Sequence, residues 1–332
     1  MGALRGGVPS TAFIAGGSRP RLLAQGERLS LPFAHERHAP RIDGFTTTTP
    51  VPLYWREDGP VAGSPILLLH GGPGAHHDYM YPQLLALAAS HRLITYDQRG
   101  GGKSKTDDPM PITWRTQVDD LARLMHELEV TSPVLVGYSW GALLAMLYCI
   151  EASKQNVESS AAHMSMPSQL VLISPAPITR AWRTEFEASL LERQRGPVIR
   201  EMRGELAASG LRETDLAAYR QRSFELSVAG YFADPRLAQA LTPFRVIGRV
   251  QQSVWDSLGD FDLRDSLRAM ARAVRLPVLV VHGREDPIPL ASAMAVAEAL
   301  DATFVELPHS GHVPYVEQPA ALFEALTRFL PT

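Results

Sequence analysis

The chain has 332 residues, of which 45% are hydrophobic and 20% are charged, and its formal net charge is −3. This composition can bury a sizeable core, and it excludes a disordered chain, a collagen-like repeat and a disulfide scaffold. The small negative charge provides no overall basic field that would attract nucleic acid or an anionic membrane. The single cysteine, Cys149, excludes an intramolecular disulfide and a cysteine-based zinc site.

No segment reaches the roughly 18 consecutive apolar residues that a membrane span needs. The apolar run at residues 11–15 is shorter than the core of a secretory signal peptide. Residues 1–41 are rich in glycine, arginine and proline and show no periodicity, so we expect a flexible N-terminal extension there. We therefore expect a cytoplasmic protein with no nucleic-acid and no membrane partner, and the sequence does not indicate its oligomeric state.

From residue 50 onward, short apolar runs alternate with amphipathic segments. Unbroken apolar runs are typical of strands that are buried on both faces of a parallel sheet. One amphipathic segment places Val118, Leu121 and Met125 on one helical face after Thr113, a residue type that caps helix N-termini. This alternation predicts an α/β fold with a mostly parallel central sheet. The predicted strands lie at residues 66–69, 93–96, 134–136, 170–173 and 278–281.

The alternation stops between residues 178 and 262, where the sequence has many charged residues, helical periodicity and no convincing strand. An insertion of helices into the sheet domain is the simplest explanation. We therefore divide the chain into an N-terminal extension at 1–41, a core at 42–177 and 263–332, and a helical cap at 178–262.

The strongest chemical signal is the segment Gly137-Tyr138-Ser139-Trp140-Gly141, which follows a predicted strand and precedes an apolar helix. A sharp strand-to-helix turn needs residues without a Cβ on either side of the serine, because its backbone is crowded. Such a turn presents the serine hydroxyl at the N-terminus of the helix. This context predicts Ser139 as a nucleophile.

A serine nucleophile needs a base that is itself oriented by an acid. For the base we favour His312, which follows the apolar run at 303–307, over His309, which lacks an adjoining glycine. For the acid we favour Asp286 over Glu285, because the proline after Asp286 favours an extended or turn backbone. The chain order serine, aspartate, histidine is the order found in α/β-hydrolases.

The oxyanion that forms during acyl transfer needs two hydrogen-bond donors. The backbone N–H of Trp140, directly after Ser139, is one expected donor. The other is expected from the turn His70-Gly71-Gly72-Pro73-Gly74, whose glycines let the backbone pass close to a bound carbonyl.

Three segments together carry a family resemblance: His70-Gly71-Gly72-Pro73-Gly74, Tyr96-Asp97-Gln98-Arg99-Gly100 and Ser139-Trp140-Gly141. With them the chain resembles the proline iminopeptidase family of α/β-hydrolases over most of residues 50–175 and 276–330. The resemblance implies an α/β-hydrolase fold, the catalytic residues Ser139, Asp286 and His312, and oxyanion donors at Gly72 and Trp140. The sequence departs from the family pattern at Tyr138, where these peptidases usually have glycine, and related esterases share the outer motifs.

Two further motifs are set aside. The segment Gly100-Gly101-Gly102-Lys103-Ser104 is similar to a phosphate-binding loop, but that pattern requires glycine where the chain has Asp97. The segment His76-His77-Asp78 contains possible metal ligands, but adjacent histidines in a loop point in different directions, and no further ligand supports them. We therefore predict neither a metal nor a cofactor.

These residues predict a serine hydrolase that works through an acyl-enzyme on a small peptide or ester substrate. The leading prediction is an aminopeptidase that releases N-terminal proline or another small residue, and the alternative is a carboxylesterase or amidase for small uncharged acyl substrates. An aminopeptidase must bind a charged α-amine, which needs a carboxylate partner inside a closed cleft. We predict Glu225, between the apolar residues Phe224 and Leu226 of the expected cap, as this carboxylate.

Overall fold

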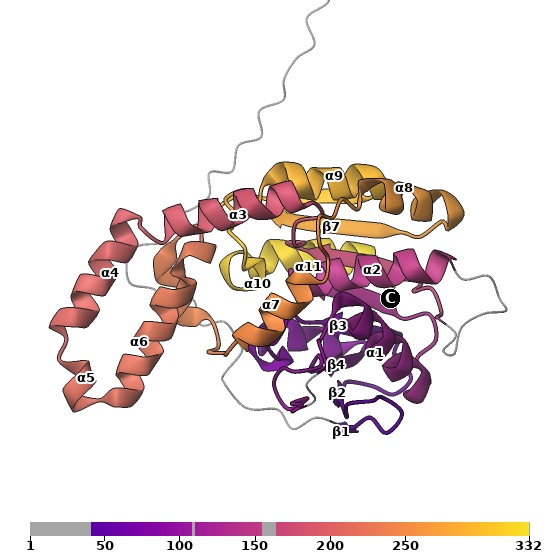
Figure 1. Ribbon diagram of the computed structural model, residues 1–332, viewed down its shortest axis with the longest axis horizontal. Helices are drawn as coiled ribbons and strands as arrows, with labels where there is room; N and C mark the ends of the chain where they lie inside the picture. Colours follow the sequence, from indigo (N-terminus) through magenta and orange to yellow (C-terminus); the bar gives the residue numbers. More distant parts are fainter. Residues whose placement is uncertain (1–40, 108–109, 155–163, 332) are drawn as a thin grey trace, which may run out of the picture. The chain divides into compact units, whose positions relative to one another are not determined.

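The computed structural model describes residues 41–107, 110–154 and 164–331, so almost all of the predicted extension at 1–41 lies outside the described residues. Within them, the chain forms an eight-stranded sheet with the order β1-β2-β4-β3-β5-β6-β7-β8 (Figure 1). Strands β3 to β8 run parallel to one another, whereas β1 and β2 are antiparallel to their neighbours. The strands are β1 Ile42–Phe45, β2 Tyr54–Asp58, β3 Pro65–Leu69, β4 Arg92–Tyr96, β5 Val134–Tyr138, β6 Gln169–Ile173, β7 Val278–Gly283 and β8 Thr303–Leu307.

The five apolar runs that predict strands correspond to β3, β4, β5, β6 and β7, which confirms the predicted α/β fold. The antiparallel strands β1 and β2 are not predicted by the apolar runs. Strand β2 is buried although it carries charged residues, because these residues pair with one another and with β4. Arg56 Nε lies 2.9 Å from Asp58 Oδ2, and Arg92 Nε lies 2.8 Å from Glu57 Oε1.

Helices cover both faces of the sheet, and successive residues of a strand point alternately to the helices on one face and to the helices on the other. In β3, Leu67 and Leu69 pack with one set of helices, whereas Ile66 and Leu68 pack with the other set. The first set is α1 Trp114–Glu127, α2 Trp140–Lys154, α8 Arg264–Ala273 and α9 Leu290–Leu300. The second set is η1 His77–Met80, η2 Gln83–Ala89, α10 Pro314–Glu317 and α11 Pro319–Phe329.

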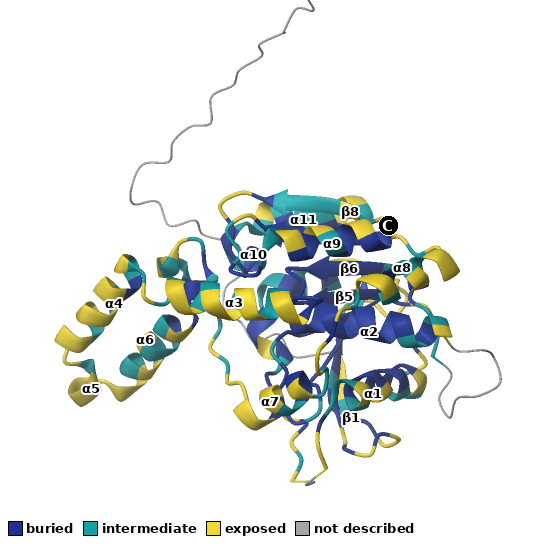
Figure 2. Ribbon diagram, turned by 45° about the horizontal axis from the view of Figure 1, so that its top comes forward, coloured by how far each residue is buried: buried dark blue, intermediate teal, exposed yellow. Residues whose placement is uncertain are grey.

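The local signals around two of these helices explain their position. Thr113 caps α1, as predicted: its side chain accepts a hydrogen bond from the Thr116 N–H, and the Thr116 side chain accepts one from the Thr113 N–H. Helix α2 is apolar on all sides, and its residues from Trp140 to Ile150 are all buried (Figure 2). A helix of this kind belongs inside the domain, next to the sheet.

Between β6 and α8 the chain forms helices and no named strand among its described residues. These helices are α3 Arg180–Arg193, α4 Pro197–Ala208, α5 Leu211–Thr214, α6 Leu216–Val228, η3 Ala229–Tyr231, η4 Pro235–Ala240 and α7 Gly248–Asp256. The two ends of this segment lie side by side, since the Arg180 N–H donates to the Phe261 carbonyl at 2.8 Å and the Leu263 N–H donates to the Ile178 carbonyl at 3.0 Å. In Figure 2, α4 and α5 are mostly exposed, and Ile199 is the only buried residue in these two helices.

In the part of the chain that the structure describes, no helix combines the length and the hydropathy needed to cross a bilayer.

Candidate active site

Ser139 occupies the sharp turn between β5 and α2. Its φ angle is +54°, a left-handed backbone conformation that is uncommon for residues other than glycine. A Cβ at Gly137 would lie 2.5 Å from the Ala142 backbone nitrogen, and a Cβ at Gly141 would lie 2.1 Å from the Leu69 carbonyl oxygen. The two glycines of the motif are therefore required by close backbone packing around the serine.

The structure brings Ser139, His312 and Asp286 together at the carboxyl ends of β5, β8 and β7. His312 Nε2 lies 2.9 Å from Ser139 Oγ, and His312 Nδ1 lies 2.9 Å from Asp286 Oδ2. The Ile288 N–H donates to Asp286 Oδ1 at 2.8 Å. Burial by itself would raise the pKa of Asp286, but the charge of His312 and the hydrogen bonds that Asp286 accepts hold its pKa below the usual value. This geometry suits a nucleophile, a base and an orienting acid.

The two competing residues lie elsewhere. His309 is exposed and has a positive φ of 57° in the loop after β8. Glu285 uses its carboxylate to accept a hydrogen bond from the Ser310 N–H at 3.1 Å. Neither side chain is part of the hydrogen-bonded chain that ends on Ser139.

The two residues predicted to donate to the oxyanion lie near Ser139, one directly after it in the chain and one in the lining of its cavity. Trp140 is the first residue of α2, where backbone N–H groups have no acceptor within the helix. Gly72 lines the same cavity as Ser139 and has a φ of +56°. The adjacent Gly71 passes so close to the nucleophile that a Cβ there would lie 2.9 Å from the Ser139 Cβ.

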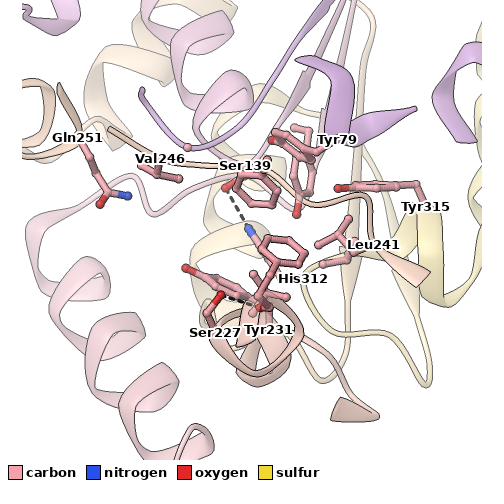
Figure 3. A pocket seen from close by; sticks show the side chains of 15 residues that line it. Tyr79, Ser139, Ser227, Tyr231, Leu241, Val246, Gln251, His312 and Tyr315 are labelled. Atoms are coloured by element: carbon pink, nitrogen blue, oxygen red, sulfur yellow. Dashed lines mark hydrogen bonds between the residues drawn. The ribbon is translucent and has the colours of Figure 1, made fainter. Parts of the chain in front are cut away.

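A cavity of about 320 Å³ opens on Ser139 and His312 (Figure 3). Apart from Ser139, His312, Ser227 and Gln251, its lining is aromatic, aliphatic or glycine, and no described Asp, Glu, Lys or Arg lines it. The aromatic and aliphatic part of the lining is Tyr79, Tyr138, Phe224, Val228, Tyr231, Leu241, Phe244, Val246, Val313 and Tyr315. The cavity therefore suits an uncharged, apolar group next to the serine.

The sequence profile of the alpha/beta hydrolase family matches residues 66–325. This chain belongs to the alpha/beta hydrolase family.

Curated relatives of this α/β-hydrolase are named proline iminopeptidases. One from Levilactobacillus brevis is 26% identical over 294 residues, which cover 80% of this chain and 88% of the relative. One from Clostridium botulinum is 24% identical and covers 87% of this chain and 97% of the relative. These relatives support a proline iminopeptidase-like member of the family, as the sequence motifs predict.

Solved structures share the fold at low sequence identity. A proline iminopeptidase-related protein from Thermus thermophilus superposes with a TM-score of 0.64 at 23% identity and covers 87% of this chain and 98% of its own. A proline iminopeptidase from Mycobacterium smegmatis has a TM-score of 0.59 at 19% identity and covers 87% of this chain and 97% of its own.

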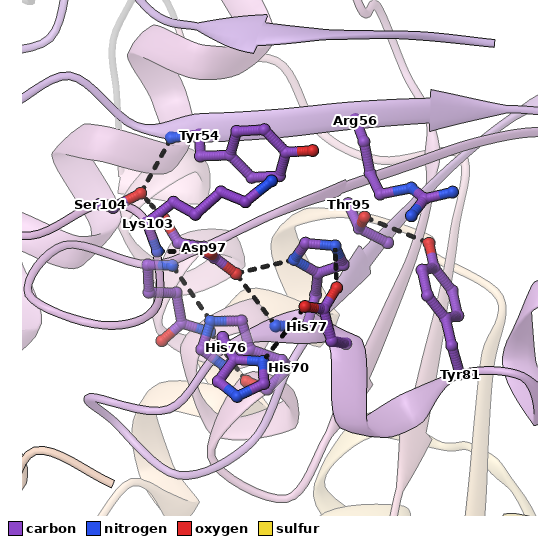
Figure 4. A network of polar contacts seen from close by, with 12 residues as sticks. Tyr54, Arg56, His70, His76, His77, Tyr81, Thr95, Asp97, Lys103 and Ser104 are labelled. Carbon is purple, nitrogen blue, oxygen red and sulfur yellow. Dashed lines mark hydrogen bonds and ion pairs between the residues drawn. The ribbon is translucent and has the colours of Figure 1, made fainter. Parts of the chain in front are cut away.

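In this α/β-hydrolase, a buried polar network supports the glycine turn at 70–74 (Figure 4). The Gln98 N–H donates to His70 Nε2 at 3.0 Å, and the Gln98 side chain donates to the His70 carbonyl at 2.7 Å. Burial lowers the pKa of His70 to about 4, so its ring is neutral and Nδ1 can donate to the Gly71 carbonyl at 2.8 Å. Trp140 Nε1 donates to Gln98 Oε1 at 2.9 Å and thus links the turn to the start of α2.

The glycine-rich segment 100–104 and the histidine pair belong to the same network. Asp97 accepts hydrogen bonds from His77 Nδ1 at 2.7 Å and from the Lys103 N–H at 2.8 Å. The Ser104 side chain donates to the Asp97 carbonyl at 2.6 Å, and Lys103 Nζ lies 3.6 Å from the centre of the Tyr54 ring. The segment is therefore a structural turn, and among the described residues no group of three possible ligands is placed to hold a metal.

The structure does not bring Glu225 together with Ser139. The Glu225 carboxylate accepts hydrogen bonds from the Gln221 side chain at 3.1 Å and from Arg222 at 2.8 Å, in a separate cavity of about 270 Å³. Phe224 instead lines the Ser139 cavity. Neighbouring residues on a helix point about 100° apart, so apolar neighbours in the sequence do not place an acid on their own face.

The sequence analysis does not predict a role for Glu317. Its buried carboxylate accepts hydrogen bonds from the Ala233 N–H at 2.7 Å, the Gly311 N–H at 2.8 Å and the Val313 N–H at 3.2 Å. Burial raises the pKa of Glu317 to about 7. The available signal is an acidic residue five positions after His312 in an otherwise apolar segment.

Proposed function

We propose that this protein is a serine hydrolase in which Ser139 is the nucleophile, His312 the base and Asp286 the orienting acid. The observation that carries this proposal is the hydrogen-bonded chain from Asp286 through His312 to Ser139, with 2.9 Å at both contacts. The left-handed turn at Ser139 and the aromatic cavity in front of it give further support.

In the proposed reaction, His312 Nε2 takes the hydroxyl proton while Ser139 Oγ attacks the carbonyl carbon of the substrate. Asp286 stabilises the imidazolium, and the N–H groups of Gly72 and Trp140 donate to the oxyanion. His312 then protonates the leaving group as its bond to the acyl carbon breaks. Water attacks the acyl-enzyme by the same route, and the acid product leaves. These steps need no metal and no cofactor.

We propose that residues 178–262 act as a cap over a core formed by 42–177 and 263–332. The adjacent ends of the segment support this division, since the backbones of Thr179 and Asp262 pair there. The segment also contributes Phe224, Tyr231 and Phe244 to the lining of the Ser139 cavity. Changes in the cap would therefore alter the choice of substrate.

The first candidate activity is an aminopeptidase that releases N-terminal proline or another small residue from short peptides. Its support comes from the curated relatives, which are named proline iminopeptidases. This activity needs a site for the substrate ammonium group, because an ion that leaves water loses several kcal/mol of solvation unless it meets a partner.

The second candidate activity is a carboxylesterase or amidase for small uncharged acyl substrates. Its support is the lining of the Ser139 cavity, which contains no Asp or Glu among the described residues. Six tyrosine and phenylalanine rings and four aliphatic side chains form most of the wall instead. An ammonium group would find no carboxylate within this wall, whereas an uncharged acyl group would lose little solvation there.

The two candidates are separated by rates of hydrolysis of prolyl-naphthylamide, N-acetyl-prolyl-naphthylamide and p-nitrophenyl butyrate, with Ser139→Ala as the control. Faster cleavage of the free amine than of its acetylated form supports the aminopeptidase. Equal or faster cleavage of the acetylated form, together with cleavage of the ester, supports the esterase or amidase. Activity that survives in Ser139→Ala would contradict both.

A further inference from the structure

Three backbone N–H groups converge on one buried carboxylate beside the proposed base. Glu317 Oε2 accepts from Gly311 at 2.8 Å and from Val313 at 3.2 Å, which are the residues on either side of His312. Glu317 Oε1 accepts from Ala233 at 2.7 Å, which follows η3 in the proposed cap. One side chain therefore joins the histidine loop to the segment after η3.

Other contacts join the same two segments directly. The His312 N–H donates to the Tyr231 carbonyl at 2.7 Å. Their rings also face each other, with the centroids 5.3 Å apart. A Cβ at Gly311 would lie 2.3 Å from the Tyr231 carbonyl oxygen, so the two backbones are in close contact. Arg193 of α3 donates to the carbonyls of Glu285 and Phe232 and adds a link from the loop that carries Asp286.

We propose that Glu317 is a positioning residue that holds the His312 ring in line with Ser139 and, through Ala233, holds Tyr231 in the wall of the substrate cavity. This inference rests on the proposed serine hydrolase function. Glu317 does not line the cavity with Ser139, and it acts through the backbone on both sides of the base.

An ionised carboxylate suits this position because it can accept hydrogen bonds at both oxygens and donates none. A glutamine amide places its NH2 group opposite at least one of the three N–H groups, and the buried donor left without an acceptor disfavours the arrangement. A protonated carboxyl group keeps fewer acceptor sites and loses the charge that strengthens these hydrogen bonds. The position is therefore sensitive both to the Glu317→Gln substitution and to protonation.

The buried position of Glu317 makes it titrate within the accessible pH range. Burial is the main cause that raises its pKa to about 7, the nearby Asp286 carboxylate raises it further, and the three N–H donors lower it. Arg193 also interacts with Glu317 and with Asp286. Because the ionised form accepts the three hydrogen bonds more strongly than the neutral form, the positioning weakens as the pH falls through about 7.

The test measures the second-order rate of Ser139 labelling by a fluorophosphonate between pH 5 and 9, so it does not depend on knowing the substrate. The pKa of Asp286 is held below its usual value, so Asp286 does not titrate in this range. In the wild type, the labelling rate should fall by more than tenfold per pH unit below about pH 7, because the proton on Glu317 acts in addition to the one that inactivates any general base. In Glu317→Gln, labelling at pH 8 should fall about tenfold or more, and the fall with decreasing pH should be shallower than in the wild type.

Glu324→Gln is the matched control, because Glu324 is an exposed acid on α11 that pairs with Arg328. It should keep the wild-type rate and the wild-type pH profile. Circular dichroism establishes whether each variant is folded. If Glu317→Gln does not fold, the wild-type profile alone decides, since a fall of no more than tenfold per pH unit would overturn the proposal.

The remaining outcomes separate this inference from the function on which it rests. If the wild type is not labelled, or if Ser139→Ala is labelled equally, the proposed serine hydrolase function fails. If labelling is specific to Ser139 but Glu317→Gln keeps the wild-type rate and pH profile, only the role of Glu317 fails.

Discussion

At the scale of single residues, the chemistry around Ser139 depends on which atoms lie within hydrogen-bond distance. His312 and His309 are three positions apart, yet only His312 contacts both Ser139 and Asp286. The left-handed turns at Ser139 and His309 show that backbone strain by itself does not mark the reacting group.

His312→Ala should reduce kcat by about 10³-fold or more, because the base is lost while the oxyanion donors remain. His309→Ala is the matched control and should change kcat by less than about twofold, since its side chain is exposed. Steady-state kinetics on any cleaved substrate measures both effects. A larger loss in His309→Ala than in His312→Ala would contradict the assignment of the base.

At the scale of elements, the direction in which a helix presents its residues matters as much as its composition. In α6, Phe224 and Val228 line the Ser139 cavity, whereas Arg222 and Glu225 line the separate cavity beside α4. The spacing of three to four residues within each set is the spacing of one helical face. Helix α1, in contrast, begins at the threonine that the sequence predicts.

Glu225→Gln should leave the KM values for prolyl-naphthylamide and p-nitrophenyl butyrate in the wild-type ratio, because the Glu225 carboxylate faces Arg222 and not the Ser139 cavity. Steady-state kinetics with both substrates measures this ratio. A selective rise in KM for the prolyl substrate would instead support the amine-binding role predicted from the sequence.

Thr113→Ala should lower the free energy of unfolding by about 1 kcal/mol, because α1 loses the side-chain acceptor at its N-cap. Urea unfolding followed by circular dichroism measures this loss. The kcat of the folded variant should stay at the wild-type value, since Thr113 does not line the Ser139 cavity. An unchanged midpoint and slope of unfolding would show that the cap does not stabilise the helix.

At the scale of the whole molecule, burial links the proposed site to the pH dependence of folding. His70 lies under the glycine turn with a pKa of about 4, below its ordinary value of 6.5. Between these values the unfolded chain takes up a proton that the folded chain does not bind. The contribution of His70 to the free energy of unfolding is therefore complete above about pH 6.5 and is lost as the pH falls towards 4.

His70→Gln should make this acid sensitivity disappear, because glutamine can accept from the Gln98 N–H without titrating. The difference in free energy of unfolding between wild type and variant should shrink by about 3 kcal/mol from pH 7 to pH 4, at about 1.4 kcal/mol for each unit of pKa shift. Urea unfolding at several pH values measures it. Subtracting the two free energies of unfolding cancels the contributions of other titrating groups. These include Glu317, whose raised pKa makes its contribution to stability grow as the pH falls. A constant difference would contradict a neutral, buried His70.

The sequence by itself determined the parallel strands, the capped start of α1, the membership of the α/β-hydrolases and the candidate residues Ser139, Asp286 and His312. These features depend on local patterns: apolar runs, a capping threonine, and glycines where the backbone is crowded. The charged strand β2 escaped the same patterns because its charges pair with one another and with Arg92, which is distant in the chain.

Only the tertiary structure decided which way Glu225 faces, what lines the Ser139 cavity and what Glu317 does. Each of these depends on contacts between segments that are far apart in the sequence, such as Glu317 and Ala233. The proposed site is assembled where the carboxyl ends of β5, β7 and β8 meet, and part of its wall comes from residues between β6 and β7. Helical periodicity specifies that an acid lies on one face, but the packing of that face decides whether the acid meets a substrate, an arginine or three backbone N–H groups.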